Sequence, residues 1–235
     1  ELDLEGIEDT DRQFVLRCFA PEKSMSVYQR GIRRRLAPML EGNIRRLALC
    51  HAVLLSLPGV PVMRYGDEIG MGEDLSLKER YAVRTPMQWS AGVNGGFSTA
   101  AAEKLLVRPV ASGSWRYQQV NVELALRQRH SLLQQVRQMV QLRAEYHEPG
   151  TTPFELVSGL PPSVLALRYR GQSRDLLMLA NFCERPVEVR LPRQEKGYWS
   201  CLLEDRRYRD RLTGGKVCRL QLADYGYRWF SRQHD

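Results

Sequence analysis

The sequence predicts α/β plus all-β structure: the C-terminal part of a (β/α)8 TIM barrel, followed by an antiparallel β-sandwich. Two observations indicate this order. A helical pattern over residues 44–57 leads through a tight turn into the apolar run at 59–65, which is one step of a β/α barrel. After Pro149-Gly150 the apolar residues recur with period two instead of a helical period. We therefore expect a barrel unit over residues 1–148 and a β-sandwich over residues 149–235.

The first predicted helix lies near the start of the chain. Thr10 and Gln13 have the spacing of a capping box, and the apolar face of FVLRCF follows until Pro21 ends the helix. Residues 30–40 are too basic, and too interrupted by glycine and proline, for a core element. We expect that segment on the surface, near the barrel mouth.

A helix, a turn and a strand come next. We expect Asn43 to cap a largely buried helix over residues 44–57, which Pro58-Gly59 ends. The run at 59–65 has the pattern of a parallel strand covered on both faces. Since the chemistry of barrel enzymes lies where such strands end, the loop that follows is the first place to look for a site.

A long connection leads from this strand to the last barrel helix. Residues 66–130 are rich in Gly, Ser, Asn and Pro, and loops of this length in a compact domain are usually functional. Ser131 and Gln134 then form another capping box, for a helix that runs through about Tyr146.

The rest of the chain reads as short strands. Their spacing implies an antiparallel β-sandwich, with a hairpin turn at residues 171–173. The predicted strands are 154–157, 164–169, 175–182, 187–191, 198–203, 217–222 and 227–230.

The net charge of +8 raises the question of nucleic acid. The arginines are scattered, however, apart from local clusters at Arg33-Arg34-Arg35 and Arg206-Arg207, and no zinc-finger, RNA-binding or helix-turn-helix signature accompanies them. We favour a solvated basic surface and expect no nucleic-acid partner. No stretch has the length needed to span a bilayer, so we expect no membrane partner.

The five cysteines are odd in number, widely spaced and mostly placed in apolar runs. This pattern is typical of reduced structural thiols, and it favours a cytoplasmic location. None of the cysteines has metal-ligand spacing, and the four histidines are scattered. We expect neither a metal site nor an organic cofactor.

Four ordered motifs in this chain resemble those of one enzyme family. They are RGIRRRLAPML, YGDEIGMGEDLSL, AVRTPMQWS with NGGFS after it, and YQQVNVELALRQRHSLL. Together they resemble the α-amylase family of retaining glycoside hydrolases and transglucosidases (glycoside hydrolase family 13). The resemblance is to the branch that contains trehalose synthases, or maltose α-D-glucosyltransferases. Long ordered motif sets seldom recur by chance.

The same resemblance implies that the chain is a C-terminal fragment. ELDLE resembles the continuation of the family's Asn-His-Asp motif, whose Asp would fall immediately before Glu1, and the family's nucleophilic Asp and acid/base Glu lie on earlier strands. A retaining glycosidase needs two carboxylates about 5 Å apart. We therefore assign no catalytic residue here and expect the chain alone to be inactive. Its parent would transfer glucose from maltose, trehalose or α-glucan to water or to a sugar hydroxyl.

Arg84, in RTPMQW, is the strongest candidate for sugar binding. The resemblance implies that it lies at the bottom of the glucose pocket and pairs with an acidic residue from an early strand. A guanidinium suits that role because its planar donors reach both a carboxylate and neighbouring sugar hydroxyls. The alternative is an arginine that holds the loop through backbone carbonyls. Pro86 restricts Thr85, which sets the direction of the loop near Arg84.

Four further residues complete the candidate site. Glu1 would line the acceptor subsite of the parent, whereas in the isolated chain we expect it to be a frayed terminus. Asp67 and Glu68 look like an acid/base pair, but adjacent residues of an extended chain point to opposite sides, so we expect one to brace the loop and the other to meet solvent or a loop. Trp89 would support the loop or, like Phe97 and Trp115, stack on a sugar.

One alternative belongs to another functional class. The chain would then be a non-catalytic carbohydrate-binding or structural module. An open upstream reading frame that supplies the earlier strands would favour the enzyme, and a true start codon near Glu1 would favour the module. Hydrolase, trehalose synthase (an isomerase) and transglucosidase all remain open.

Overall fold

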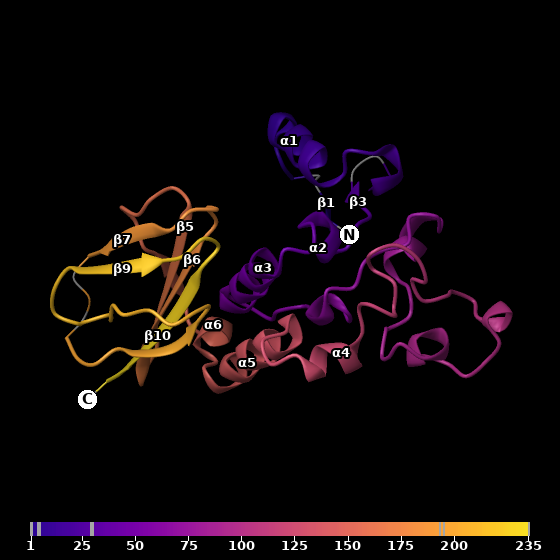
Figure 1. Ribbon diagram of the computed structural model, residues 1–235. Coiled ribbons are helices and arrows are strands. Elements are labelled where there is room, and N and C mark those ends of the chain that lie inside the picture. The colour runs from indigo at the N-terminus through magenta and orange to yellow at the C-terminus, as the bar shows by residue number, and fades with distance from the viewer. Residues whose placement is uncertain (1, 4–5, 29–30, 193, 195, 235) are drawn as a thin grey trace. The chain divides into compact units, whose positions relative to one another are not determined.

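The computed structural model describes residues 2–3, 6–28, 31–192, 194 and 196–234 (Figure 1). The chain forms two compact units: residues 1–47 with 63–135, and residues 48–62 with 136–235. We treat each unit by itself. These compact units differ from the predicted domains, since residues 48–62 and 136–148 group with the C-terminal unit. A domain boundary near residue 149 remains a prediction from the sequence.

The first unit begins with a small antiparallel sheet and a helix. β1 (Leu2–Asp3), β3 (Gly31–Ile32) and β2 (Ser26–Val27) pair in that order, and α1 spans Asp9–Phe19. The helix confirms the sequence prediction, but its N-cap does not. The N-cap is Glu8, which makes no side-chain capping bond, and Thr10 lies within the helix. The other short elements are η1 (Lys23–Met25), α2 (Leu36–Met39), η2 (Asp67–Ile69), η3 (Glu79–Val83), η4 (Val93–Gly96), η5 (Ala102–Lys104) and α4 (Val122–Arg127).

The two long helices of the barrel part lie where the sequence predicts them. α3 spans Ile44–Ser56 and α5 spans Leu132–Glu145. Asn43 caps α3, because its Oδ1 accepts hydrogen bonds from the backbone N–H of Arg45 (3.1 Å) and Arg46 (3.2 Å). Ser131 caps α5, because its Oγ accepts from the backbone N–H of Gln134 (3.3 Å). No helix in the described part of the chain is both long and apolar enough to cross a membrane.

The predicted strand over residues 59–65 is wrong for this chain. The segment is irregular, and Val60 and Val62 are 88% and 83% exposed. A strand exists only through the ladder it forms with a neighbour. None of the described residues pairs with this segment as a strand, so its apolar side chains remain in solvent.

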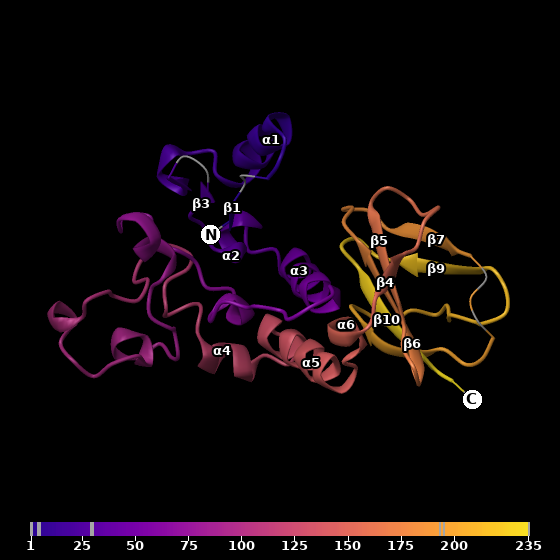
Figure 2. The same ribbon diagram turned by 180° about the vertical axis from the view of Figure 1, so that it is seen from behind.

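The predicted sandwich strands are all present, with shifts of a few residues at their ends. One antiparallel sheet has the order β4-β5-β6-β10-β8, and a two-stranded ribbon pairs β7 with β9 (Figures 1 and 2). The predicted hairpin joins β5 to β6, where Gly171 N–H donates to Arg174 O (2.9 Å). A short helix α6 (Glu148–Thr151) precedes the strands and was not predicted. The strands are β4 (Phe154–Leu156), β5 (Val164–Arg170), β6 (Arg174–Asn181), β7 (Val187–Leu191), β8 (Ser200–Glu204), β9 (Cys218–Leu222) and β10 (Tyr227–Gln233).

Strand β6 is buried on both faces, which explains its continuous apolar run. One face belongs to the sandwich core, made of Ala166, Leu177, Leu179, Val189, Leu191, Trp199, Leu212, Cys218, Leu220, Leu222 and Phe230. On the other face, Met178 and Ala180 lie with Trp229 against Ala52 of α3. The buried Tyr169 hydroxyl adds a hydrogen bond to Ser56 O (2.6 Å), and burial raises the pKa of Tyr169 to about 12.

Candidate functional site

The candidate site is the loop that carries Tyr65 to Trp89, and buried arginines hold it in place. The sequence predicts a solvated, basic surface for the segment that contains Arg33 and Arg35, and this prediction is wrong. Arg33 is 9% exposed and Arg35 is 2% exposed. A buried charge is stable only when its donors are satisfied, and here the carbonyls of the long loop supply most of the partners.

Arg33 binds the outer part of the loop. Its Nη1 donates to Leu77 O (2.8 Å) and Glu79 O (3.1 Å), and its Nη2 donates to Leu75 O (3.0 Å). Its Nε donates to Ser24 O (2.5 Å), in the segment before the small sheet. One guanidinium thus fixes several turns of a loop that has no sheet of its own.

Arg35 binds the inner part of the loop. Its Nη2 donates to Tyr65 O (2.5 Å) and to Asp67 Oδ1 (2.9 Å), and its Nη1 donates to Val83 O (3.3 Å). Gly66 lies beside it with φ of 87°, and a Cβ there would lie 2.9 Å from Arg35 Nη2 and 2.2 Å from Met71 Sδ. Only glycine fits this turn. Arg35 therefore joins the two ends of the segment that leads to Arg84.

Arg84 itself is exposed at the end of this braced segment. It follows the 3₁₀ turn η3, where its backbone N–H donates to Tyr81 O (3.1 Å). Its neighbours are fixed, because Val83 and Thr85 are fully buried and Tyr65 Oη donates to Thr85 O (2.9 Å). Within the described part of the chain, its guanidinium has no hydrogen-bond or ion-pair partner. The backbone is rigid here, and the five N–H donors of the side chain remain open to a ligand.

Asp67 and Glu68 lie in the 3₁₀ turn η2, not in an extended segment. Asp67 accepts from Arg35, and its side chain is 19% exposed. Glu68 is half-buried, and burial raises its pKa although hydrogen bonds from the backbone of Glu68 and Gly66 lower it. Asp67 thus braces the loop through Arg35, whereas burial favours the protonated form of Glu68.

Trp89 combines a fixed backbone with an open side chain. Its N–H donates to Gly95 O (2.7 Å) and its carbonyl accepts from Glu123 N–H (3.0 Å), while the indole is 51% exposed. Trp115 differs: it packs against Gly72, where an added Cβ would lie 2.2 Å from Trp115 Cγ. Trp115 is therefore an anchor of the loop, whereas the indole of Trp89 remains accessible.

Some residues of this site were not identified from the sequence. Gln88 is fully buried, and its Nε2 donates to Trp115 O (3.3 Å) and to Val120 O, which ties RTPMQW to the distal loop. Arg33 and Arg35 follow strand β3 at alternate positions, and that spacing places both on one side of the chain. Glu1, a predicted site residue, lies outside the described residues.

Arg84 thus presents an open guanidinium and Trp89 an accessible indole, each on a backbone whose neighbouring groups are hydrogen-bonded.

The family description of the α-amylase catalytic domain matches residues 31–149, and that of a sucrose hydrolase-like C-terminal domain matches residues 173–231. The chain belongs to the α-amylase family. The trehalose synthase/amylase TreS of Mycolicibacterium smegmatis is 37% identical over 98% of the chain, which corresponds to 40% of that protein. Trehalose synthase of Pimelobacter sp. is 40% identical over 83% of the chain, and 35% of its own length is matched.

Solved structures of this α-amylase family share the fold. The α-amylase from H. orenii superposes with a TM-score of 0.66 over 85% of the chain, at 22% identity and 38% of its own length. Trehalose-6-phosphate hydrolase from Bacillus licheniformis superposes with a TM-score of 0.66 over 86% of the chain, at 18% identity. The match covers 41% of the hydrolase. The predicted fold class, a C-terminal part of the barrel followed by an antiparallel β-sandwich, is confirmed.

Proposed function

We propose that this chain is part of a retaining enzyme of the trehalose synthase kind, which moves glucose from an α-glucoside to water or to a sugar hydroxyl. The observation that carries the proposal is the 37% identity to trehalose synthase/amylase TreS along 98% of the chain. Since the chain spans 40% of that relative, the activity is one of a longer protein, with both catalytic carboxylates outside residues 1–235.

Arg84 is the sugar-binding residue in this proposal. Its guanidinium is exposed and unpartnered among the described residues, while the backbone on both sides is buried and hydrogen-bonded. That geometry favours ligand binding over the loop-holding alternative, because an arginine that holds a loop spends its donors on carbonyls, as Arg33 and Arg35 do. Trp89, which follows shortly after Arg84 in the sequence, offers an exposed aromatic surface. Asp67 supports the loop through its ion pair with Arg35.

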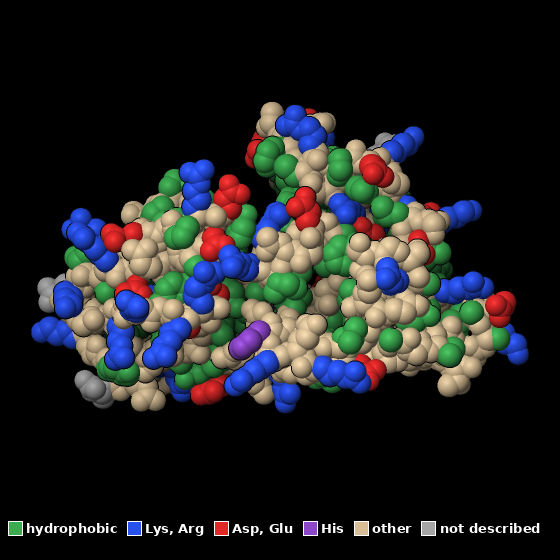
Figure 3. All heavy atoms as spheres, in the orientation of Figure 1, with side chains coloured by type: hydrophobic (Ala, Val, Ile, Leu, Met, Phe, Trp, Pro, Cys, Tyr) green, Lys and Arg blue, Asp and Glu red, His purple; other side chains and the backbone are tan. Residues whose placement is uncertain are grey.

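Location and partners follow from the same proposal. All five cysteines are free thiols, which supports a reducing cytoplasm. Figure 3 shows Lys and Arg side chains dispersed over the visible face and interspersed with acidic ones, so an α-glucoside substrate is favoured over nucleic acid.

The test is Arg84→Lys in the longer enzyme. Lysine keeps the charge but lacks the planar fork, so kcat/KM on maltose or trehalose should fall about ten- to a hundredfold, as expected when a hydrogen bond to a charged group is lost. Tm should change little. Arg80→Lys is the matched control, because Arg80 is exposed in the same loop with its guanidinium over the Tyr28 ring (5.6 Å). Near-normal activity, or activity lost only in step with Tm, would make Arg84 a structural residue.

A further inference from the structure

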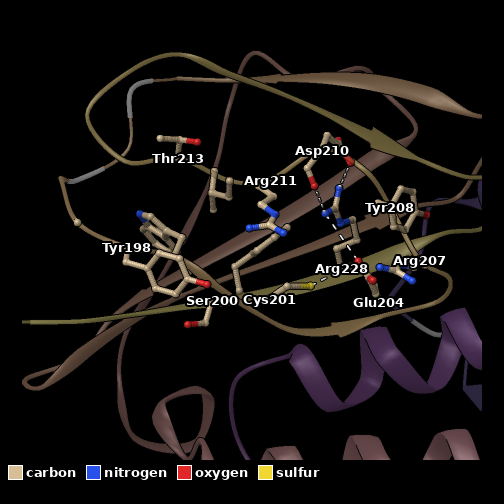
Figure 4. A pocket seen from close by; sticks show the side chains of 14 residues that line it. Tyr198, Ser200, Cys201, Glu204, Arg207, Tyr208, Asp210, Arg211, Thr213 and Arg228 are labelled. Carbon is tan, nitrogen blue, oxygen red and sulfur yellow. Dashed lines mark hydrogen bonds and ion pairs between the residues drawn. The ribbon is translucent and has the colours of Figure 1, made fainter.

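Two polar hollows of the β-sandwich unit share Tyr198 in their lining. The larger has a volume of about 460 Å³ and is lined by Tyr198, Ser200, Arg207, Arg211 and Thr213, among others (Figure 4). The second, of about 400 Å³, is lined by Tyr146, Arg174, Ser231 and Gln233, and it shares Tyr198 and Ser200 with the first. Each hollow lies in the size range of small-molecule sites.

Tyr198 is exposed on a fixed backbone. Tyr198 is 78% exposed, whereas the next residue, Trp199, is buried in the sandwich core. The backbone of Tyr198 forms an isolated antiparallel bridge with Thr213. Arg232 Nη1 holds the preceding turn by donating to Lys196 O (2.8 Å). Among the Phe, Tyr and Trp residues of the described chain, Tyr198 is the most exposed.

The floor of the larger hollow holds a buried ion-pair network. The buried guanidinium of Arg228 donates to Asp210 Oδ1 (2.9 Å) and lies 3.7 Å from Glu204 Oε2, with Tyr208 stacked on it at 4.3 Å. Arg207 and Arg211 line the same hollow, and within the described residues neither side chain has a partner. Figure 4 shows Arg211 between Tyr198 and Arg228.

This mixture of groups suits hydroxyls better than an anion. Hydroxyls both donate and accept, so they can use the free donors of Arg207 and Arg211 together with the carboxylate of Glu204. The oxygens of Asp210 already accept from Arg228 and from the backbone N–H of Gln221. A phosphate would have no hydrogen-bond donor for the Glu204 carboxylate, whereas a sugar hydroxyl has one. The ring of Tyr198 supplies the apolar surface on which the C–H face of a pyranose packs.

We propose that Tyr198 is the platform of an α-glucan-binding site in the β-sandwich. The ligand is an oligosaccharide of several glucose units. When one glucose unit packs on the Tyr198 ring, the neighbouring units can extend into the two hollows that share Tyr198. The choice of α-linked glucose rests on the proposed function, whereas the existence of a sugar site rests on the hollows and the exposed ring.

The experiment measures binding of maltoheptaose to the 235-residue chain by isothermal titration calorimetry. Tyr198→Ala should raise Kd at least about tenfold, as expected for an aromatic anchor. Tyr198→Phe keeps the ring and should stay within about twofold of the native Kd, and Arg211→Ala should weaken binding. Phe182→Ala is the matched control, because Phe182 is a 50% exposed aromatic residue of the same unit that lines neither hollow. It should leave Kd unchanged.

Four results would overturn the proposal. The first is no binding by the native chain, and the second is an unchanged Kd in Tyr198→Ala. The third is displacement of maltoheptaose by inorganic phosphate, which would make the hollow an anion site. The fourth is equal, Tyr198-dependent affinity for cellohexaose, which would remove the α-glucan assignment. Since the readout is binding and not turnover, failure of the Arg84 test would leave these outcomes unaffected.

Discussion

Three consecutive arginines, Arg33 to Arg35, contact the long loop and do not form a solvated basic surface. Arg33 and Arg35 are buried and spend their donors on the carbonyls of the long loop, while Arg34 forms an ion pair with Glu73 (2.9 Å). Five planar donors on one side chain can satisfy several carbonyls that have no sheet partner. The loop that carries Arg84 is therefore ordered by side chains instead of by a backbone ladder.

Replacing Arg35 tests this role. Arg35→Met keeps the apolar stem but leaves Asp67 and two carbonyls without their donor, so the free energy of unfolding should fall by about 2–4 kcal/mol. Urea titration of the chain gives the measurement. Arg17→Met is the control, since Arg17 is exposed at the end of α1, and its effect should stay within about 0.5 kcal/mol. Equal effects of the two changes would show that Arg35 is not a brace.

At the scale of elements, the ends of β6 and β10 are joined by charge. Asp175 of β6 is 2% exposed and accepts from Arg232 Nη2 of β10 (2.6 Å), with His234 Nε2 at 3.0 Å. Burial by itself would raise the pKa of Asp175, but the hydrogen bonds from Arg232 and His234 outweigh it and the pKa is lowered. The ionised carboxylate of Asp175 thus adds a charged hydrogen bond to the backbone ladder that pairs β6 with β10.

This pair predicts a pH dependence of stability. Since the folded-state pKa of Asp175 lies below the unfolded value of about 3.9, its contribution is present above about pH 4 and is lost as the pH falls through the folded pKa. Asp175→Asn should cost about 1–3 kcal/mol at pH 7. The difference from the native chain should shrink toward pH 2. Urea titrations across this range provide the measurement.

A surface carboxylate provides the comparison. Glu188 of β7 has a 52% exposed side chain and lies 3.9 Å from Arg219, so Glu188→Gln should change stability little at any pH. A pH-independent loss in Asp175→Asn would show that the residue acts through shape and not through charge.

At the scale of the whole molecule, the chain matches an α-amylase catalytic domain and, after it, a sucrose hydrolase-like C-terminal domain. It spans 40% of the length of the Mycolicibacterium smegmatis relative and 35% of the Pimelobacter relative. We expect the 235-residue chain alone to show no hydrolysis of maltose, p-nitrophenyl glucoside or starch above a heat-killed control. The physical reason is that retaining hydrolysis needs two carboxylates about 5 Å apart, whereas Asp67 is held by Arg35. Turnover by the purified chain would place a catalytic pair within it.

Elements whose signals are local could be predicted from the amino-acid pattern alone. Helices α3 and α5 could be predicted because Asn43 and Ser131 lie beside the N–H groups that they cap, and the sandwich strands because alternation and turn residues are read within a few positions. The family was recognisable for the same reason, since its motifs are contiguous.

Features that depend on distant partners became visible only in the folded chain. Residues 59–65 have a strand pattern without a strand, because a ladder needs a neighbour. Arg33 and Arg35 are buried because loop carbonyls some forty residues away along the sequence accept their donors, which no local pattern reveals. Likewise, the hollows around Tyr198 form where β8, β10 and the segment before β9 meet, so the sequence gives no sign of them.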